Sequence, residues 1–90
     1  MAGKEHTRAN GGSDITVRLG RRIRALRLAR GWTQGDLAAY AEIHRTYISD
    51  VERGDRNIAV RNIEAIAHAL GLPVRDLFPL EDEAPFDAPA

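Results

Sequence analysis

Apolar residues recur in this sequence at every third or fourth position, and this spacing constrains the fold more than any other feature. Leu19, Ile23 and Leu26 follow the i, i+4, i+7 pattern of one face of an α-helix. The stretch between residues 60 and 70 repeats the pattern. No segment shows the alternation of apolar and polar residues that a half-buried β-strand requires. The sequence therefore predicts an all-α fold.

Capping residues and glycines divide the periodic part of the chain into five helices. The predicted helices cover about residues 15–30, 34–41, 45–53, 60–70 and 74–78. Asp14 or Thr16 can cap the first helix, and Thr33 with Asp36 comes close to a capping box at the second. Glycines supply the left-handed residue that commonly ends a helix at Gly31, Gly54 and Gly71. The second and third helices are short and only a few residues apart, which is helix-turn-helix geometry.

The two ends of the chain differ in composition from the middle. Residues 1–14 hold glycines and polar side chains with scarcely an apolar group, which predicts a flexible N-terminal arm. Residues 80–90 are acidic and contain two prolines, which predicts a flexible C-terminal tail. We therefore expect one folded domain over residues 15–79.

Charge is unevenly distributed along the chain, although its sum is zero. The sequence has 13 basic and 13 acidic residues, but four of the acids lie in the last ten residues. Residues 1–79 hold 13 bases against 9 acids, a net charge of +4. A cationic domain with an acidic appendage is the pattern expected of a protein that binds a polyanion.

Several classes of protein are excluded by what the sequence lacks. There are no cysteines, which removes disulfides and thiolate metal sites. The three histidines have no metal-ligand spacing, and the chain has neither a phosphate-binding glycine loop nor a nucleophile motif. No apolar stretch is long enough to cross a membrane. We expect a cytoplasmic, nucleoid-associated protein that is not an enzyme and uses no metal, cofactor or membrane.

Three stretches sharpen the helix-turn-helix prediction. They are TQGDLA at 33–38, IHRTYISDVERG at 43–54 and IEAIAHALG at 63–71. Together they closely resemble the Cro/C1-type (XRE) helix-turn-helix family, which includes phage repressors and restriction-modification controller proteins. The resemblance spans about residues 19–78. It implies a compact five-helix bundle, the lambda-repressor-like DNA-binding domain, and a transcriptional regulator whose third helix reads bases.

The resemblance places the base-reading residues at the start and along one face of the third helix. They are His44, Arg45, Thr46, Ser49 and Asp50. Arg45 can donate two hydrogen bonds to guanine, and the methyl group of Thr46 can contact that of thymine. Phosphates repel a carboxylate, so Asp50 either accepts from cytosine or, as we favour, orients Arg45 or Arg53.

A second group of residues is expected to contact the phosphate backbone. It comprises Thr33, Gln34, Tyr47, Arg53, Arg56 and Asn57. The start of the second helix offers unpaired backbone N–H groups and the Gln34 amide to a phosphate. The basic residues after the third helix lie where the family grips the backbone, while Tyr47 is either a phosphate contact or a core aromatic. The alternative for Gln34 is a side chain that only helps to cap the second helix, and for Arg53, Arg56 and Asn57 it is a solvent-facing basic loop.

Four further positions carry structural expectations from the resemblance. Arg27 and Glu52 occupy positions that form an ion pair in the family, where loss of one partner costs several kcal/mol. Glu42 stands where the turn usually has glycine, so it is expected to adopt a left-handed conformation at a cost of about 1 kcal/mol. Gly35 replaces a better helix former and weakens the second helix by about 1 kcal/mol.

A DNA-binding domain this small is expected to act as a homodimer, because a single half-site binds too weakly to select a promoter. Two-fold symmetry would place the two recognition helices roughly 34 Å apart on a pseudo-palindromic operator. The candidate interface residues are the apolar side chains of the last segment, Val74, Leu77, Phe78 and Leu80.

A function through a protein partner stays open as the alternative. An antitoxin-like or bridging protein would use the acidic tail, in which Phe86 lies between carboxylates, as its contact. The same tail is a candidate contact for RNA polymerase, or a segment that only aids solubility. Arg45 and the cationic loop after the third helix favour DNA as the partner.

Overall fold

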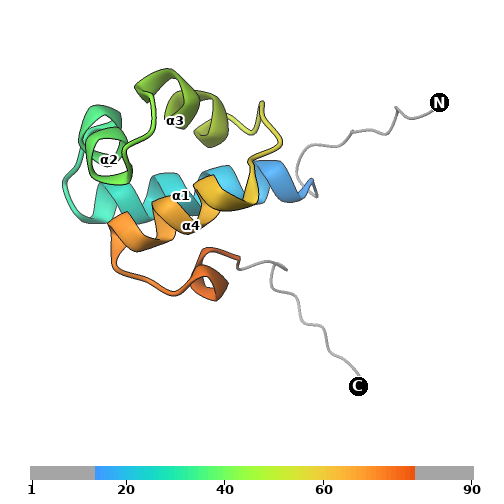
Figure 1. The fold of residues 1–90 in the computed structure, drawn as a ribbon. Coiled ribbons are helices and arrows are strands. Elements are labelled where there is room, and N and C mark those ends of the chain that lie inside the picture. Colours follow the sequence, from blue (N-terminus) through green and yellow to red (C-terminus); the bar gives the residue numbers. More distant parts are fainter. Residues whose placement is uncertain (1–13, 79–90) are drawn as a thin grey trace.

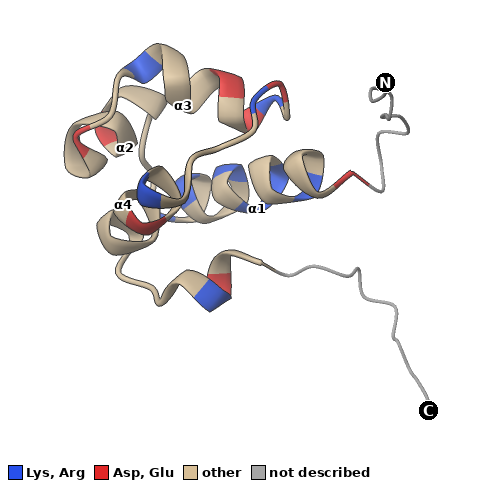
Figure 2. Ribbon diagram, turned by 45° about the vertical axis from the view of Figure 1, so that its right-hand side comes forward, with Lys and Arg blue, Asp and Glu red and all other residues tan. Residues whose placement is uncertain are grey.

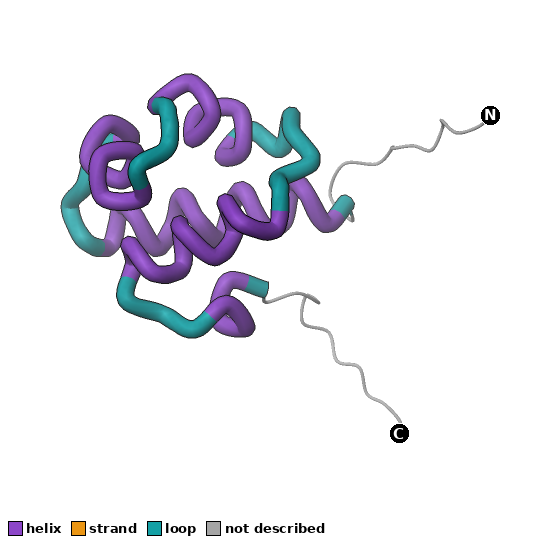
Figure 3. Tube along the Cα trace, in the orientation of Figure 1, coloured by secondary structure: helices purple, strands orange, loops and turns teal. Residues whose placement is uncertain are grey.

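The computed structural model describes residues 14–78, and every regular element within this range is helical (Figures 1 and 3). Four α-helices follow one another along the chain, α1 (Ile15–Ala29), α2 (Gln34–Ala41), α3 (Arg45–Glu52) and α4 (Val60–Leu70). A short 3-10 helix, η3 (Val74–Leu77), completes the described part. The prediction of an all-α fold is confirmed. The predicted N-terminal arm and the acidic tail, with its possible protein contacts, lie outside the described residues apart from Asp14.

The fifth predicted helix is a single 3-10 turn, so the count of five α-helices is not confirmed. Its hydrogen bonds join residues three apart in the chain. The Asp76 N–H donates to the Pro73 carbonyl at 2.9 Å, and the Phe78 N–H donates to the Arg75 carbonyl at 3.2 Å. Pro73 fixes the entry to this segment, and so few residues cannot start the i to i−4 ladder of an α-helix.

The predicted capping residues begin the first two helices. Asp14 caps α1 by accepting the backbone N–H of Thr16 at 2.8 Å. At α2 the capping box is complete, since the Thr33 hydroxyl accepts the Asp36 N–H at 3.0 Å and the Asp36 carboxylate accepts the Thr33 N–H at 2.9 Å. α2 has the predicted bounds, whereas α1 and α3 each end one residue earlier than predicted.

The turn between α2 and α3 contains a non-glycine residue in the left-handed conformation. Glu42 has φ 59° and ψ 44°, which confirms the prediction for this position. It is the one non-glycine residue with positive φ between residues 14 and 78. An L-residue in this conformation costs about 1–2 kcal/mol.

The hydrophobic core lies where all five elements meet. α3 packs on α1, α2 packs on α3 and α4, and η3 packs against α4 and α1 on the side opposite α3 (Figure 1). Each element contributes one completely buried side chain, in order Ile23, Leu37, Ile48, Ile66 and Leu77. This packing leaves α2 and α3 together on one side of the molecule.

The prediction of a dimer interface is wrong for one of the four residues, Leu77. Leu77 is 0% exposed, because η3 turns it into the core of its own chain. Phe78 is half-buried and packs against that core. Val74 is 40% exposed, which leaves it accessible to a partner. Leu80 lies outside the described residues.

Candidate nucleic-acid interface

Helix α3 turns a polar face away from the core. His44, Arg45 and Thr46 are exposed, and Ser49 and Asp50 are half-buried. An open hollow of about 380 Å³ lies on this face. Its lining residues are Gln34, His44, Arg45, Thr46, Ser49, Asp50 and Arg53. The fold therefore brings the five predicted base contacts together with two predicted phosphate contacts.

A glycine lets α3 lie directly against α1. A Cβ atom on Gly20 would lie 2.2 Å from the Val51 carbonyl oxygen and 2.9 Å from that of Glu52. Packed atoms do not approach so closely, so any side chain at this position would push the two helices apart. This contact was not predicted from the sequence. A glycine inside an amphipathic helix was the available signal.

A buried ion pair also ties α3 to α1. Nε and Nη2 of Arg27 donate to the two carboxylate oxygens of Glu52 at 2.7 and 2.8 Å. The two side chains are only 7% and 3% exposed. The hydrogen bond to Glu52 raises the pKa of Arg27 above its usual value, so this guanidinium stays charged. Nη1 of Arg27 donates to the Trp32 carbonyl at 2.7 Å and so holds the entry to α2 as well.

Gln34 extends this buried pair to the first turn of α2. Its Nε2 donates to Oε1 of Glu52 at 3.1 Å, a contact the sequence analysis did not foresee. A side-chain amide has two N–H donors, so one remains beside the unpaired backbone N–H groups at the helix start. Gln34 thus keeps one N–H donor for its predicted phosphate contact, and its hydrogen bond to Glu52 fixes the orientation of the amide.

His44 caps the N-terminus of α3. Its Nδ1 accepts the backbone N–H of Thr46 at 3.1 Å, so this nitrogen carries no proton and Nε2–H is the donor. The ring is exposed at the edge of the hollow. His44 therefore combines a structural role with a hydrogen-bond donor that faces solvent.

The end of α3 holds a network of opposite charges, visible as adjacent blue and red segments in Figure 2. The two oxygens of Asp50 accept hydrogen bonds from Arg53 and, at 3.1 Å, from Arg56. Arg53 also donates to Ser49 Oγ at 2.8 Å and to the Asp55 carboxylate at 3.0 Å. Arg56 first, and then Arg53, holds the pKa of Asp50 below its usual value. Asp50 therefore pairs with Arg53, one of the two arginines it was predicted to orient, and with Arg56 in place of Arg45.

Tyr47 connects α3 to the loop that follows it. The guanidinium carbon of Arg56 lies 4.5 Å from the centre of the Tyr47 ring, within cation–π distance. The Tyr47 hydroxyl accepts the backbone N–H of Ala59 at 3.1 Å. The ring is half-buried and packs against the core, which supports the description of Tyr47 as a core aromatic, and its phosphate contact stays a prediction.

The remaining predicted phosphate contacts lie on both sides of the hollow on α3. Thr33 is exposed, and its hydroxyl accepts the capping hydrogen bond but keeps its own proton to donate. Arg56 and Asn57 line a second hollow of about 350 Å³ near the N-terminus of α1. The predicted phosphate contacts therefore extend from the start of α2 to the loop after α3.

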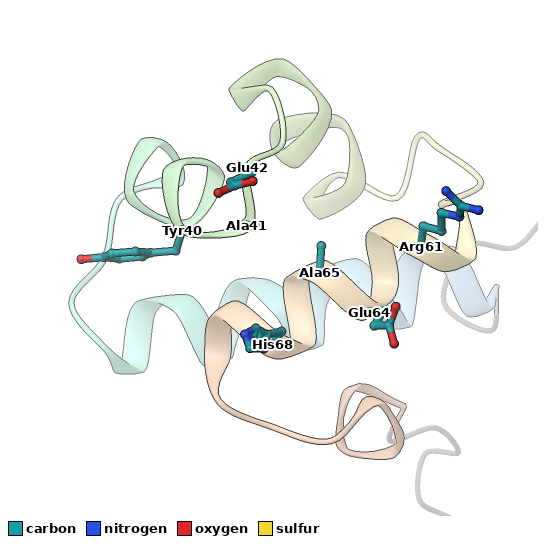
Figure 4. Close-up of a pocket in the computed structure, with 7 residues that line it drawn as sticks. All are labelled: Tyr40, Ala41, Glu42, Arg61, Glu64, Ala65 and His68. Atoms are coloured by element: carbon teal, nitrogen blue, oxygen red, sulfur yellow. The ribbon is translucent and has the colours of Figure 1, made fainter.

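A third hollow, of about 450 Å³, lies between the end of α2 and the outer face of α4 (Figure 4). Its lining residues are Tyr40, Ala41, Glu42, Arg61, Glu64, Ala65 and His68. Two of its five ionisable side chains are carboxylates, which makes it poorly suited to a phosphate. The hollow on α3 remains the better nucleic-acid interface.

α2 and α3 are two short, adjacent helices, and α3 is fixed to the core and turns a polar face outward. This arrangement defines the helix-turn-helix class of protein. A family model for the helix-turn-helix matches residues 23–77. The chain therefore belongs to the Cro/C1-type (XRE) helix-turn-helix family of DNA-binding transcriptional regulators.

Control proteins and repressors are among its relatives. The chain is 44% identical to control protein C.BamHI of Bacillus amyloliquefaciens over 66 residues, which is 72% of this chain and 82% of the relative. It is 43% identical to the immunity repressor of Bacillus phage phi105 over 56 residues, 62% of this chain but only 39% of the repressor. The crystal structure of the restriction-modification controller protein C.AhdI from Aeromonas hydrophila matches with a TM-score of 0.69 at 43% identity, covering 70% of this chain and 96% of C.AhdI.

None of the helices between residues 14 and 78 is long and apolar enough to cross a membrane.

Proposed function

We propose that this chain is a transcriptional regulator that binds a specific pseudo-palindromic operator as a homodimer, with α3 in the major groove. The observation that carries the proposal is the polar face of α3, whose side chains match the hydrogen-bonding groups of base edges. Gly20 and the buried Arg27–Glu52 pair hold this helix in place. Membership of a family of controllers and repressors supports the same function.

Arg45 carries most of the base specificity in this proposal. It is exposed at the start of α3, where its guanidinium can donate to O6 and N7 of one guanine. Thr46 presents a methyl group to thymine, while His44 and Ser49 add hydrogen-bonding groups at either end of the hollow. A bidentate contact of the Arg45 kind discriminates by about 1–3 kcal/mol against the wrong base.

The phosphate contacts flank this reading face. Thr33, Gln34 and the first backbone N–H groups of α2 hold the phosphate on one side. Arg53, Arg56 and Asn57 hold the backbone on the other, together with the hydroxyl of Tyr47. These contacts are independent of sequence, and they make binding depend on salt concentration.

The proposed homodimer places its interface at the C-terminal side of the domain. Val74 is the apolar residue of η3 that remains accessible, and Phe78 and Leu80 follow it along the chain. η3 lies opposite α3, so an interface there leaves both recognition helices free (Figure 1). Two half-sites one helical turn apart follow from the two-fold symmetry.

The test is selection from a random duplex pool at near-physiological salt, followed by titration of the enriched duplex. We expect an inverted repeat with half-sites about one helical turn, roughly 34 Å, apart. Arg45→Ala should weaken binding to this duplex roughly 5- to 150-fold for each half-site and relax the preference at one base pair in each half-site. Arg21→Ala removes the same charge from the exposed face of α1 and serves as the control. Failure to enrich any motif would refute sequence-specific readout.

A further inference from the structure

The carboxylate of Asp50 holds two arginines at once. One oxygen accepts a hydrogen bond from Arg53, and the other accepts one from Arg56 at 3.1 Å. Arg53 is the C-cap of α3, whereas Arg56 lies in the following loop, so Asp50 joins cations from two segments. The Asp50 side chain is 22% exposed, although those of Arg53 and Arg56 are 55% and 43% exposed.

Tyr47 holds Arg56 as well. The guanidinium carbon lies 4.5 Å from the Tyr47 ring centre, and the Tyr47 hydroxyl accepts the backbone N–H of Ala59 at 3.1 Å. Tyr47 and Asp50 both belong to α3. The helix that faces the bases therefore sets the direction of a cation in the neighbouring loop.

Charge alone gives a different expectation for Asp50. A carboxylate on a DNA-facing surface repels phosphate, so its removal should strengthen binding to every duplex equally. Asp55 provides the comparison within the same network. Its carboxylate carries the same charge and pairs with Arg53 at 3.0 Å, but its described ion pairs do not include Arg56.

We propose that Asp50 is a positioning residue that clamps Arg56 against Tyr47 and thereby makes its phosphate contact depend on correct docking of α3. A free arginine reaches a phosphate on any duplex, because its long side chain can adopt many rotamers. A clamped arginine reaches one only when α3 lies in the groove in the matching register. Asp50 thus lowers affinity for random DNA more than affinity for the operator. This inference rests on the proposed sequence-specific DNA binding.

The test compares Asp50→Asn with Asp55→Asn on two duplexes of equal length, the enriched one and a scrambled one, at one salt concentration. Fluorescence anisotropy gives both dissociation constants, and their ratio measures specificity. Asp55→Asn should tighten binding to both duplexes and keep the ratio within about twofold. Asp50→Asn should tighten binding to the scrambled duplex and lower the ratio about tenfold, within the range of coupling between contacting side chains.

A double-mutant cycle shows whether Asp50 acts through Arg56. The variant Asp50→Asn with Arg56→Ala should have the same specificity ratio as Arg56→Ala alone. Thermal unfolding of each variant separates this effect from loss of structure, because a merely structural role would lower the midpoint and leave the ratio unchanged.

Three results would overturn the inference. The first is an Asp50→Asn ratio equal to that of wild type or Asp55→Asn. The second is an effect that adds to that of Arg56→Ala and falls on one base pair, which would make Asp50 a direct cytosine contact. If wild type itself failed to distinguish the two duplexes, the proposed function would fail along with the inference.

Discussion

Replacing Arg27 by methionine should destabilise the domain by about 3–5 kcal/mol, because Glu52 would stay buried without its partner. Arg27 is 7% exposed and Glu52 is 3% exposed, with hydrogen bonds of 2.7 and 2.8 Å between them. The substitution also removes the bond to the Trp32 carbonyl. A carboxylate left alone at this depth loses most of its hydration and keeps only the Gln34 amide as a partner.

This loss is large for a domain of this size. Roughly 65 residues correspond to a total stability of about 3–10 kcal/mol. In a domain this small, each kcal/mol shifts the unfolding temperature by about 4–8 °C, so we expect Arg27→Met to lower it by about 12–40 °C. Circular dichroism with temperature or urea gives the unfolding midpoint directly.

Two further variants make the interpretation specific. Arg24→Met removes an exposed arginine from the same helix and should change stability by less than about 0.5 kcal/mol. Arg27→Met combined with Glu52→Leu should recover much of the loss, since an apolar pair replaces a buried ion pair at little cost. The reasoning fails if Arg27→Met costs no more than Arg24→Met, or if the double variant is less stable than the single one.

Three other predictions follow from the backbone and from the charge network. Gly20→Ala should lower the free energy of unfolding by about 3 kcal/mol, because the added Cβ would lie 2.2 Å from a carbonyl oxygen of α3. In Gly35→Ala the added Cβ meets nothing closer than 3.6 Å, so this substitution should stabilise α2 by about 1 kcal/mol. Equal effects of the two substitutions in urea unfolding would contradict the close approach of α1 and α3. Glu42→Gly should stabilise by about 0.5–1 kcal/mol through relief of the left-handed conformation, and a loss of stability would show that the residue is unstrained. The carboxyl carbon of Asp50, followed by NMR, should titrate below the usual aspartate range because Arg56 favours the charged form. The stability that these contacts contribute is therefore fully present above the usual aspartate pKa and is lost as the pH falls through the lowered pKa. Arg56→Ala should raise the midpoint of the Asp50 titration.

Local signals made most of the fold predictable. The capping residues Thr33 and Asp36 predicted the start of α2, and the spacing of apolar residues predicted α1 and α4. The left-handed conformation of Glu42 followed from the family resemblance, in which this position of the turn usually has glycine. These features depend on the conformational preferences of residues that lie only a few positions apart in the chain.

The remaining features depend on residues that are distant in the chain. A glycine inside a helix signals a close approach at Gly20 but does not say that the carbonyls of α3 will lie against it, and Gln34 meets Glu52 only after α2 and α3 have packed. Leu77 looked like an interface residue because the pattern of a short apolar segment does not say which side chain faces the core. The network around Asp50 was foreseen only in outline, since the position of Arg56 depends on the path of its loop.

The glycine contact between α1 and α3 has a consequence for how such a protein would meet DNA. With backbone against backbone at Gly20, α3 has little room to slide or tilt against α1, and its amides should exchange with solvent only when the whole domain opens. If α3 is held rigidly, conformational adjustment on binding falls to the duplex. On the proposed operator, base steps that no side chain touches would then contribute to operator choice through the energy required to bend them.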